Sequence, residues 1–309
     1  MKLHKLFSSV ILLFLIITKS FAQQEQLYIV YPFMPLSVNP AYAGSRGVVD
    51  ITGIYRRKPL FQNLGFSSNQ QYLSFDMPIA QDKMAIGFQA FNASQAFGTV
   101  GGISGNLGFY GDYAYKIYLP HDGVLSLGAQ IGLTQIPVVA QGSTSQFKTS
   151  LGLGAYYSNK DWYAGLSFLN LAGSTEFNYT KPVFLTAGYL FDLSDMVKLK
   201  TGILARRLSG GNVNTTDLDF NVTAWINQRF GIGVWYQNTG SEFSNKAILA
   251  SLEVQLGDNI RVGYSYDFDS SDVTAGSQTG QIGVGGFHQL MFRYQLDSGN
   301  GKIATFKYF

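Results

Sequence analysis

The sequence predicts an all-β protein, a transmembrane antiparallel up-and-down β-barrel of about 14 strands with an irregular N-terminal segment. Charged residues make up only 13% of the 309 residues, aromatic residues make up 15%, and glycine occurs 35 times. Soluble domains carry about twice that share of charge. No stretch reaches the 18 or so apolar residues that a membrane helix needs. Short segments with an apolar residue at every second position recur instead, which is typical of barrel strands that face lipid on one side.

Residues 260–268 show this alternation most clearly. The even positions are all apolar, and the odd positions are Arg261, Gly263, Ser265 and Asp267. Because a strand sends successive side chains to opposite faces, this segment has one apolar and one polar face. A single such strand would also fit a soluble sandwich. A soluble sheet with so many exposed Tyr, Phe and Leu residues would aggregate and leave open edges, whereas a closed barrel in a membrane avoids both problems.

Residues 1–22 have the features of a cleaved signal peptide. Lys2 and Lys5 precede a short apolar run at 10–17, and Ser20-Phe-Ala22 places small residues at the cleavage site. We predict cleavage after Ala22 and, because the chain has no cysteine, neither a lipid anchor nor disulfides. The signal holds three of the 22 basic residues and none of the 19 acidic ones, so the mature chain is neutral. A neutral chain gives no reason to expect nucleic-acid binding.

Residues 23–45 are predicted to form an irregular segment that packs in or against the barrel. Pro32, Pro35 and Pro40 each lack a backbone donor and restrict the residue before them, so a long strand is not expected here. The segment is also rich in apolar residues, which need a larger structure to cover them.

Residues 46–296 are predicted to form the barrel as a single domain. Short turns alternate with longer Ser-, Thr- and Gly-rich connections, as in barrels whose two ends face different compartments. Gly257-Asp-Asn259 has the chemistry of a hairpin turn. Residues 297–309 are assigned to a C-terminal tail or an extra strand. The expected strands are 46–57, 71–78, 83–91, 104–119, 123–134, 150–158, 162–169, 183–191, 196–206, 218–227, 229–237, 246–256, 260–268 and 288–296.

Motifs for catalysis, cofactors or metals are not found. His4 leaves with the signal, His121 lies beside a proline in an expected turn, and His288 opens the last strand. The nucleophile and zinc motifs of hydrolases and metalloproteases are absent. Glycine pairs such as those at Gly154 and Gly231 lie within strands, where we expect them to relieve crowding inside the barrel. We therefore predict no catalytic residue, no metal and no cofactor.

Basic residues recur on the polar face of the strands. A charge that faces lipid near mid-membrane costs about 2–4 kcal/mol, so these residues should face the lumen or the interfaces. They form either internal salt bridges, with Asp76, Asp219, Glu253 and Asp267 as partners, or a basic surface that holds an acidic peptide or plug. The predicted lumen row is Lys83, Lys116, Lys198, Lys200, Arg206, Arg229, Arg261 and Arg293.

Several segments resemble the PorP/SprF family of outer-membrane proteins, which belong to the type IX secretion system of Bacteroidota. The resemblance begins at Leu36-Ser-Val-Asn-Pro-Ala-Tyr-Ala-Gly44 and the following Tyr55-Arg-Arg57. It continues through Tyr110-Gly-Asp-Tyr-Ala-Tyr-Lys116 and residues 162–171 to the closing strand at 288–296, and so covers nearly all of the mature chain. The chain departs from the family at Lys58-Pro59, where an aromatic residue is common, and in the tail after residue 296.

The resemblance implies a non-enzymatic barrel in the outer membrane that assists secretion or surface anchoring of a large cargo or adhesin protein. Its implied partners are that cargo and other components of the type IX secretion system. A passive porin or hydrophobic-solute channel is the alternative, and an outer-membrane enzyme would need a Ser/His/acid cluster that the sequence does not supply.

The family motif supplies the candidate site residues Asn39, Pro40, Tyr42, Gly44, Tyr55 and Arg56. Asn39 and Pro40 suit a turn that fixes the entry of the segment, and Gly44 suits a positive φ or a close approach. Two roles remain open. The motif seats the segment against the barrel wall, or Tyr42 and its neighbours form a docking surface for a partner.

Overall fold

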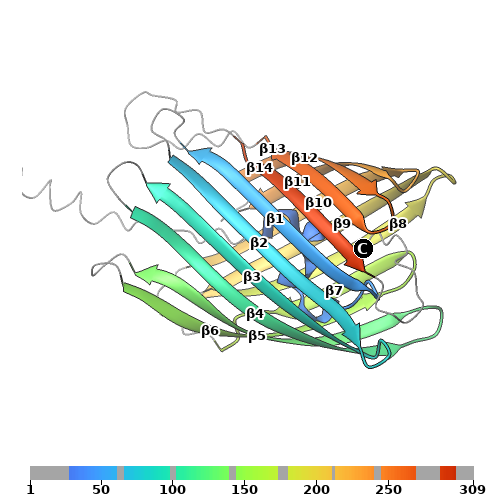
Figure 1. The fold of residues 1–309 in the computed structure, drawn as a ribbon, viewed down its shortest axis with the longest axis horizontal. Coiled ribbons are helices and arrows are strands. Elements are labelled where there is room, and N and C mark those ends of the chain that lie inside the picture. The colour runs from blue at the N-terminus through green and yellow to red at the C-terminus, as the bar shows by residue number, and fades with distance from the viewer. Residues whose placement is uncertain are drawn as a thin grey trace, which may run out of the picture.

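The chain forms a closed barrel of 14 antiparallel strands in which each strand pairs with its sequence neighbours and β1 pairs with β14. This arrangement, seen in a computed structural model (Figure 1), confirms the predicted fold class. The structure describes residues 28–60, 66–97, 102–138, 144–172, 180–210, 213–239, 245–268 and 286–296. The predicted signal, the loop at 269–285 and the tail at 297–309 lie outside these residues.

The strands begin and end close to the predicted ranges, and several extend further at the end with the longer connections. Their bounds are β1 Val49–Leu60, β2 Phe66–Ile79, β3 Met84–Phe97, β4 Gly102–Tyr118, β5 Val124–Val138, β6 Thr144–Ser158, β7 Trp162–Phe168, β8 Lys181–Asp192, β9 Val197–Gly210, β10 Val213–Ile226, β11 Phe230–Thr239, β12 Asn245–Leu256, β13 Ile260–Asp267 and β14 His288–Leu296.

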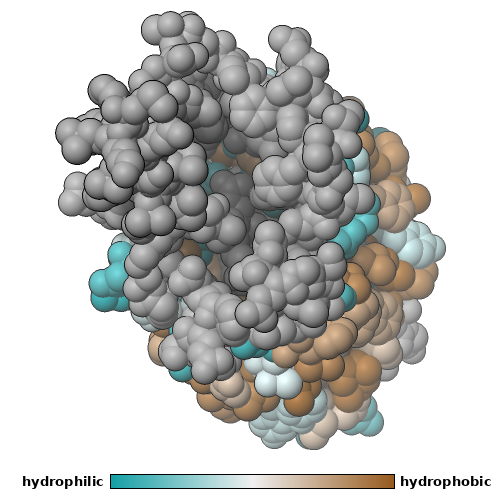
Figure 2. Space-filling view, turned by 90° about the vertical axis from the view of Figure 1, so that its left-hand side faces the viewer, coloured by the Kyte–Doolittle hydropathy of each residue, from teal (hydrophilic) through white to brown (hydrophobic). Residues whose placement is uncertain are grey.

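The alternating pattern becomes an apolar outside and a polar inside. On β13, Val262 and Tyr264 are exposed on the outer wall, whereas Arg261, Ser265 and Asp267 are buried toward the lumen. Figure 2 shows hydrophobic side chains gathered over the outer wall where the placed residues are visible. This wall is the surface that a bilayer would cover.

Among the residues that the structure describes, six connections between neighbouring strands are tight turns of three to five residues, and they all lie at the end where β1 begins and β14 ends. Several of their residues have positive φ, including Asn227 at 50° and Gln228 at 57° in the β10–β11 turn. Positive φ at both central residues matches the right-handed twist of a hairpin. The remaining connections lie at the opposite end of the barrel.

Three short helical pieces of the N-terminal segment lie inside the barrel (Figure 1), namely η1 Tyr28–Phe33, α2 Pro35–Val38 and η2 Pro40–Tyr42. Each piece contains a proline, and the prolines of α2 and η2 stand in the first turn, where their missing N–H costs nothing. Among the described residues, no helix has the length and apolar character to span a bilayer. We call residues 31–44 the plug segment.

Two basic residues of the predicted lumen row lie elsewhere. Lys83 belongs to the β2–β3 turn and Arg229 to the β10–β11 turn, and both are exposed. The prediction extended the inward parity of β3 and β11 past the ends of these strands, where the chain has already turned away from the lumen. The barrel also begins at Val49 instead of residue 46, because residues 43–48 form turns.

Candidate functional site: the occupied barrel lumen

The Asn39 side chain joins the plug segment to the wall, and both ends of its amide form hydrogen bonds. Its Oδ1 accepts a hydrogen bond from the Ala41 backbone N–H at 3.0 Å and so caps η2. Its Nδ2 donates to the Ala155 carbonyl of β6 at 2.9 Å and lies 3.5 Å from the Leu166 carbonyl of β7. One side chain therefore holds η2 against the seam between two strands.

Inward-facing glycines create the surface on which η2 rests. A Cβ added to Gly154 would lie 2.1 Å from the Asn39 Oδ1, and one added to Gly128 would lie 2.3 Å from the Ala41 backbone nitrogen. The same addition at Gly165 would place a Cβ 2.9 Å from the Asn39 Nδ2. The strand glycines thus relieve crowding as the sequence predicts, and what they make room for is the backbone of the plug segment.

Gly44 makes the turn that returns the chain to the wall. Its φ is 65°, and an added Cβ would lie 2.5 Å from the Ala85 Cβ, so both predicted reasons for glycine hold. The Gly44 N–H donates to an Asp76 carboxylate oxygen at 2.7 Å, and its carbonyl accepts from the Lys116 Nζ. Lys116 also pairs with Asp82 of the β2–β3 turn at 2.6 Å.

Further along the plug segment, side chains of the wall bind backbone carbonyls. The Phe33 carbonyl accepts from the Arg293 guanidinium at 2.9 Å, and the Leu36 carbonyl accepts from the Gln89 Nε2 at 3.1 Å. Ser167 donates its hydroxyl to the Val38 carbonyl at 2.5 Å. Short helices leave their last carbonyls without intrahelical partners, and these wall donors satisfy them.

A buried charge cluster joins the segment to the seam between the first and last strands. Asp50 of β1 lies 3.3 Å from the Arg46 Nε and 3.6 Å from the Arg293 Nε of β14. Thr52 donates to Asp50 at 2.8 Å and accepts from the Arg293 Nε at 3.0 Å. Because Arg293 also binds the Phe33 carbonyl, closure of the β1–β14 seam and seating of the plug segment share one side chain.

Tyr42 is 3% exposed and packs edge-on against Tyr156, with ring centroids 5.4 Å apart. Burial raises the pKa of the Tyr42 phenol above its ordinary value, so the phenol stays neutral. Burial lowers the pKa of Arg46, but the net shift is upward because the Asp50 carboxylate lies nearby, so Arg46 stays charged. The motif residue Tyr42 is thus part of the interior and is not presented at the surface.

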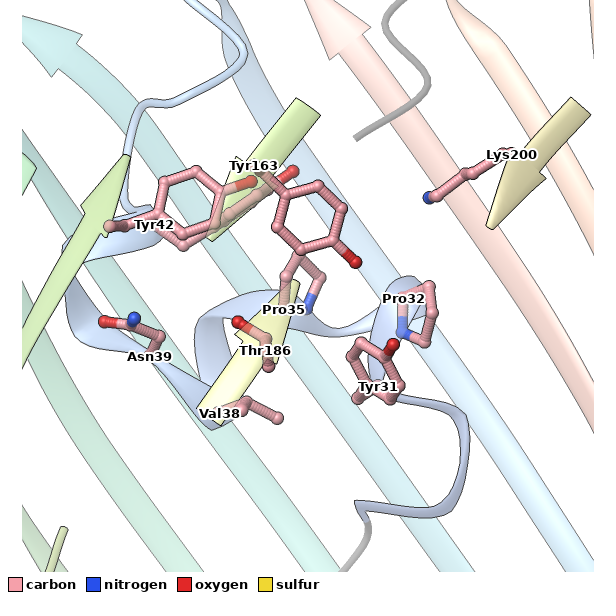
Figure 3. Close-up of a pocket in the computed structure, with 10 residues that line it drawn as sticks. Tyr31, Pro32, Pro35, Val38, Asn39, Tyr42, Tyr163, Thr186 and Lys200 are labelled. Carbon is pink, nitrogen blue, oxygen red and sulfur yellow. The ribbon is translucent and has the colours of Figure 1, made fainter. Parts of the chain in front are cut away.

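On the side of β6 to β9, a small cavity of about 30 Å³ lies between the plug segment and the wall (Figure 3). This volume holds roughly two water molecules. The Lys200 amine points toward it from β9, next to Tyr31 and Pro32 of the plug segment (Figure 3). Beyond it, Arg261 lies 4.8 Å from the ring of Trp225 and 3.8 Å from Glu253.

The remaining candidate residues divide between the lumen, the rim and the outer wall. Arg206 pairs with Asp217, and Lys198 pairs with Asp192 at 2.6 Å near the tight-turn rim. Arg56 faces the lumen, where its guanidinium lies 3.3 Å from the ring centroid of Phe287. Tyr55 points outward, is 42% exposed and hydrogen-bonds Asn69 of β2. The motif Tyr55-Arg56 therefore belongs to both surfaces of the barrel.

Sequence reasoning did not single out the neutral side chains that bind the plug segment. Gln89, together with Gln130, also donates to Asp112, at 2.6 and 2.8 Å. These residues occupy inward positions of alternating strands, so the period-two pattern could have marked them as lumen residues. Nothing in the sequence marked them as partners of residues 33–38. Within the described ranges, no group of three or more His, Cys, Asp or Glu residues is placed to hold a metal ion.

Two outer-membrane proteins of known structure are weakly similar to this chain. The outer membrane protein Omp33 of Acinetobacter baumannii is 8% identical over 81% of this chain and 98% of its own, with a TM-score of 0.48. The KdgM porin is 8% identical over 79% of this chain and 99% of its own, with a TM-score of 0.41. These likenesses are too weak to bear on function, and no curated protein matches the chain. The family described as "Type IX secretion system membrane protein PorP/SprF" matches residues 20–294, nearly the whole chain, and the protein therefore belongs to the PorP/SprF family.

Proposed function

We propose that this protein is a non-enzymatic barrel of the outer membrane that assists the type IX secretion system in secreting or anchoring a large cargo or adhesin protein. Membership of the PorP/SprF family supports the secretion context. The observation that carries the proposal is the occupied lumen. A general porin needs a continuous aqueous path, whereas here a segment of the chain itself lies across the lumen.

The passive channel remains the second candidate. In its favour is the polar inner wall, which includes Gln130, Ser126 and Thr186 at positions facing the lumen. Against it stand the close contacts of the plug segment with strands on all sides. The proposal therefore assigns the barrel to holding or guiding a partner and not to free diffusion of solutes.

The plug segment that the basic row meets is not acidic. Residues 28–44 contain no charged side chain, and Lys116 and Arg293 bind backbone carbonyls of this segment. Lys116, Arg261 and Arg293 also have carboxylate partners within 4 Å. These contacts support internal pairing as the role of the row.

The motif Asn39-Pro-Ala-Tyr-Ala-Gly44 is proposed to seat the segment and not to dock a partner. Asn39 and Tyr42 are 4% and 3% exposed, so a partner could reach them only if the segment left the lumen. Separate substitution of Asn39, Tyr42 and Gly44 tests this. Variants that fold and seat the segment normally but lose secretion would support docking instead.

The central experiment is affinity purification of the tagged full-length protein from native outer membranes. We expect a large secreted protein or components of the type IX system to co-purify, and a strain lacking the protein to lose that cargo from its surface. Purification of the barrel alone, together with unchanged surface proteins in the deletion strain, would refute the proposal. A mock purification from the deletion strain provides the background.

A further inference from the structure

We propose that the plug segment is a gate, and that the barrel conducts ions and small solutes when residues 31–44 leave their seat. This adds a conducting state to the secretion role proposed above but does not depend on it. Three features of the structure support it: the segment closes the lumen, its hydrogen bonds to the wall can be replaced by water, and the wall around it carries many polar side chains.

Three buried clusters carry the plug segment across the whole lumen. The first packs Phe33 and Met34 against residues of β1, β2, β11, β12 and β14. The second packs Leu36 and residues 41–43 against β3, β4, β6 and β7. The third packs Tyr31 and Val38 against Leu204 of β9, among other residues. Strands all around the barrel therefore contact one short segment, which leaves no wide path beside it.

The way the segment is held is suited to release. Its hydrogen bonds to the wall run largely to its backbone carbonyls, from Arg293, Gln89, Ser167 and Lys116. Water can replace each of these acceptors once the segment moves, because every one of these donors is polar. The plug segment itself carries no charge, so its release leaves no broken ion pair within the segment.

The wall behind the segment combines apolar contact patches with many polar side chains. Its polar inward side chains include Asp76, Asp112, Ser126, Gln130 and Thr186, all buried in the closed state. Barrels of 8 strands are filled by their own side chains, whereas barrels of about 16–18 strands leave an aqueous channel. With 14 strands and polar side chains between the apolar patches, the emptied lumen would admit water.

The glycine seat provides a direct test with a matched control. Gly128→Leu with Gly154→Leu places side chains where the backbone of Ala41 and the Asn39 amide now lie. Gly111→Leu adds the same side chain at a strand position with no heavy atom within 4 Å of the added Cβ. In planar bilayers we expect steady conductance steps from the double variant, and only brief openings at high voltage from Gly111→Leu and the unaltered protein. Folding of each variant is checked by its heat-dependent shift in gel mobility.

A folded double variant that shows no conductance overturns the proposal, and so does a Gly111→Leu variant that conducts equally well.

A second pair of substitutions is designed to hold the plug segment in place. The chain has no cysteine, and a Cβ added to Gly87 lies 3.1 Å from the Leu36 Cδ2, so Leu36→Cys with Gly87→Cys is designed to form a single disulfide, whose formation is checked by thiol titration. We expect brief openings at high voltage only after reduction, and records that do not differ between the oxidised and reduced forms also overturn the proposal.

These readouts are independent of secretion. If the double variant conducts but deletion of the barrel leaves the surface proteins unchanged, the gate is supported and the secretion role is refuted. A silent double variant that still co-purifies with its cargo would do the reverse.

Discussion

At the scale of single residues, several polar side chains bind backbone groups across the boundary between the plug segment and the wall. Asn39 is the clearest case, because its amide caps η2 and also reaches the carbonyls of β6 and β7. A buried donor or acceptor that loses its partner costs about 1–3 kcal/mol. Seating of the plug segment therefore depends on a few side chains, each of which can be tested separately.

We expect Asn39→Ala to weaken seating of the plug segment by about 1–3 kcal/mol, because the cap and both wall contacts are lost. Cleavage of the segment by an added protease should accelerate about tenfold for each 1.4 kcal/mol lost, since cleavage follows the population of the released form. Asn159→Ala is the control. Asn159 accepts from the Asp161 and Trp162 N–H groups within the β6–β7 turn, so its loss should leave cleavage of the segment unchanged.

Arg293→Ala should destabilise the barrel strongly, because it leaves Asp50 with one cation fewer and removes the donor to the Phe33 carbonyl. Breaking one partner of a buried pair costs about 3–5 kcal/mol. Urea unfolding in detergent, followed by gel mobility, measures the change. A double-mutant cycle with Asp50→Asn should give a coupling free energy clearly different from zero, and strict additivity would show that the two side chains act independently.

At the scale of elements, the hairpin turns require positive φ at particular residues, and some residue types adopt it less easily than others. Asn227 and Gln228 both adopt positive φ between β10 and β11, and asparagine tolerates this conformation far better than glutamine. On the other side of the barrel, β7 ends at Phe168, and the next residue, Leu169, keeps the inward parity and joins Tyr31 and Val38 in a buried cluster. Wall residues beyond a strand end can thus still pack on the plug segment.

Replacement of Gln228 by glycine should stabilise the protein by about 0.5–1 kcal/mol, because glycine adopts the observed φ of 57° without steric cost. The resulting Asn-Gly pair suits a turn in which both central residues have positive φ. The midpoint of urea unfolding should rise for Gln228→Gly and stay level or fall for Gln228→Ala. An equal rise in both variants would mean that the gain has another origin.

At the scale of the whole molecule, the position of a residue along its strand sets how deep it lies in the bilayer that would cover the outer wall. Exposed apolar residues such as Val234 and Leu252 occupy mid-strand positions on this wall, while Leu193 lies in a tight turn at the rim. Substitution by arginine costs about 2–4 kcal/mol at the membrane midplane and about 0–1 kcal/mol near the interface. The barrel should therefore respond to depth and not to exposure alone.

Val234→Arg is expected to reduce the free energy of unfolding in lipid vesicles by about 2–4 kcal/mol, whereas Leu193→Arg should reduce it by about 1 kcal/mol or less. The two side chains have similar exposed fractions, 56% and 62%, so exposure cannot account for a difference. Equal losses would contradict a membrane position of the mid-strand band. Equilibrium unfolding in vesicles provides the measurement.

The barrel, its strand number and the side of each strand that faces lipid could be predicted from the amino-acid sequence alone. These features follow from a two-residue period and from turn chemistry, both of which are local and can be read along the chain. The positive φ of Gly44 and the crowding at Gly154 were also predictable, because only glycine meets such demands cheaply. The prediction was wrong for Lys83 and Arg229, because parity continues in the sequence after a strand has ended.

The filling of the lumen by the plug segment, and the side chains that hold it, are seen only in the three-dimensional structure. Asn39 meets Ala155 across 116 positions and Phe33 meets Arg293 across 260, so neither contact leaves a local pattern in the sequence. A period of two says that Gln89 and Ser167 face inward, but not what they will face. That is fixed by the register of all 14 strands, because closing the barrel brings distant residues to the same depth around one lumen.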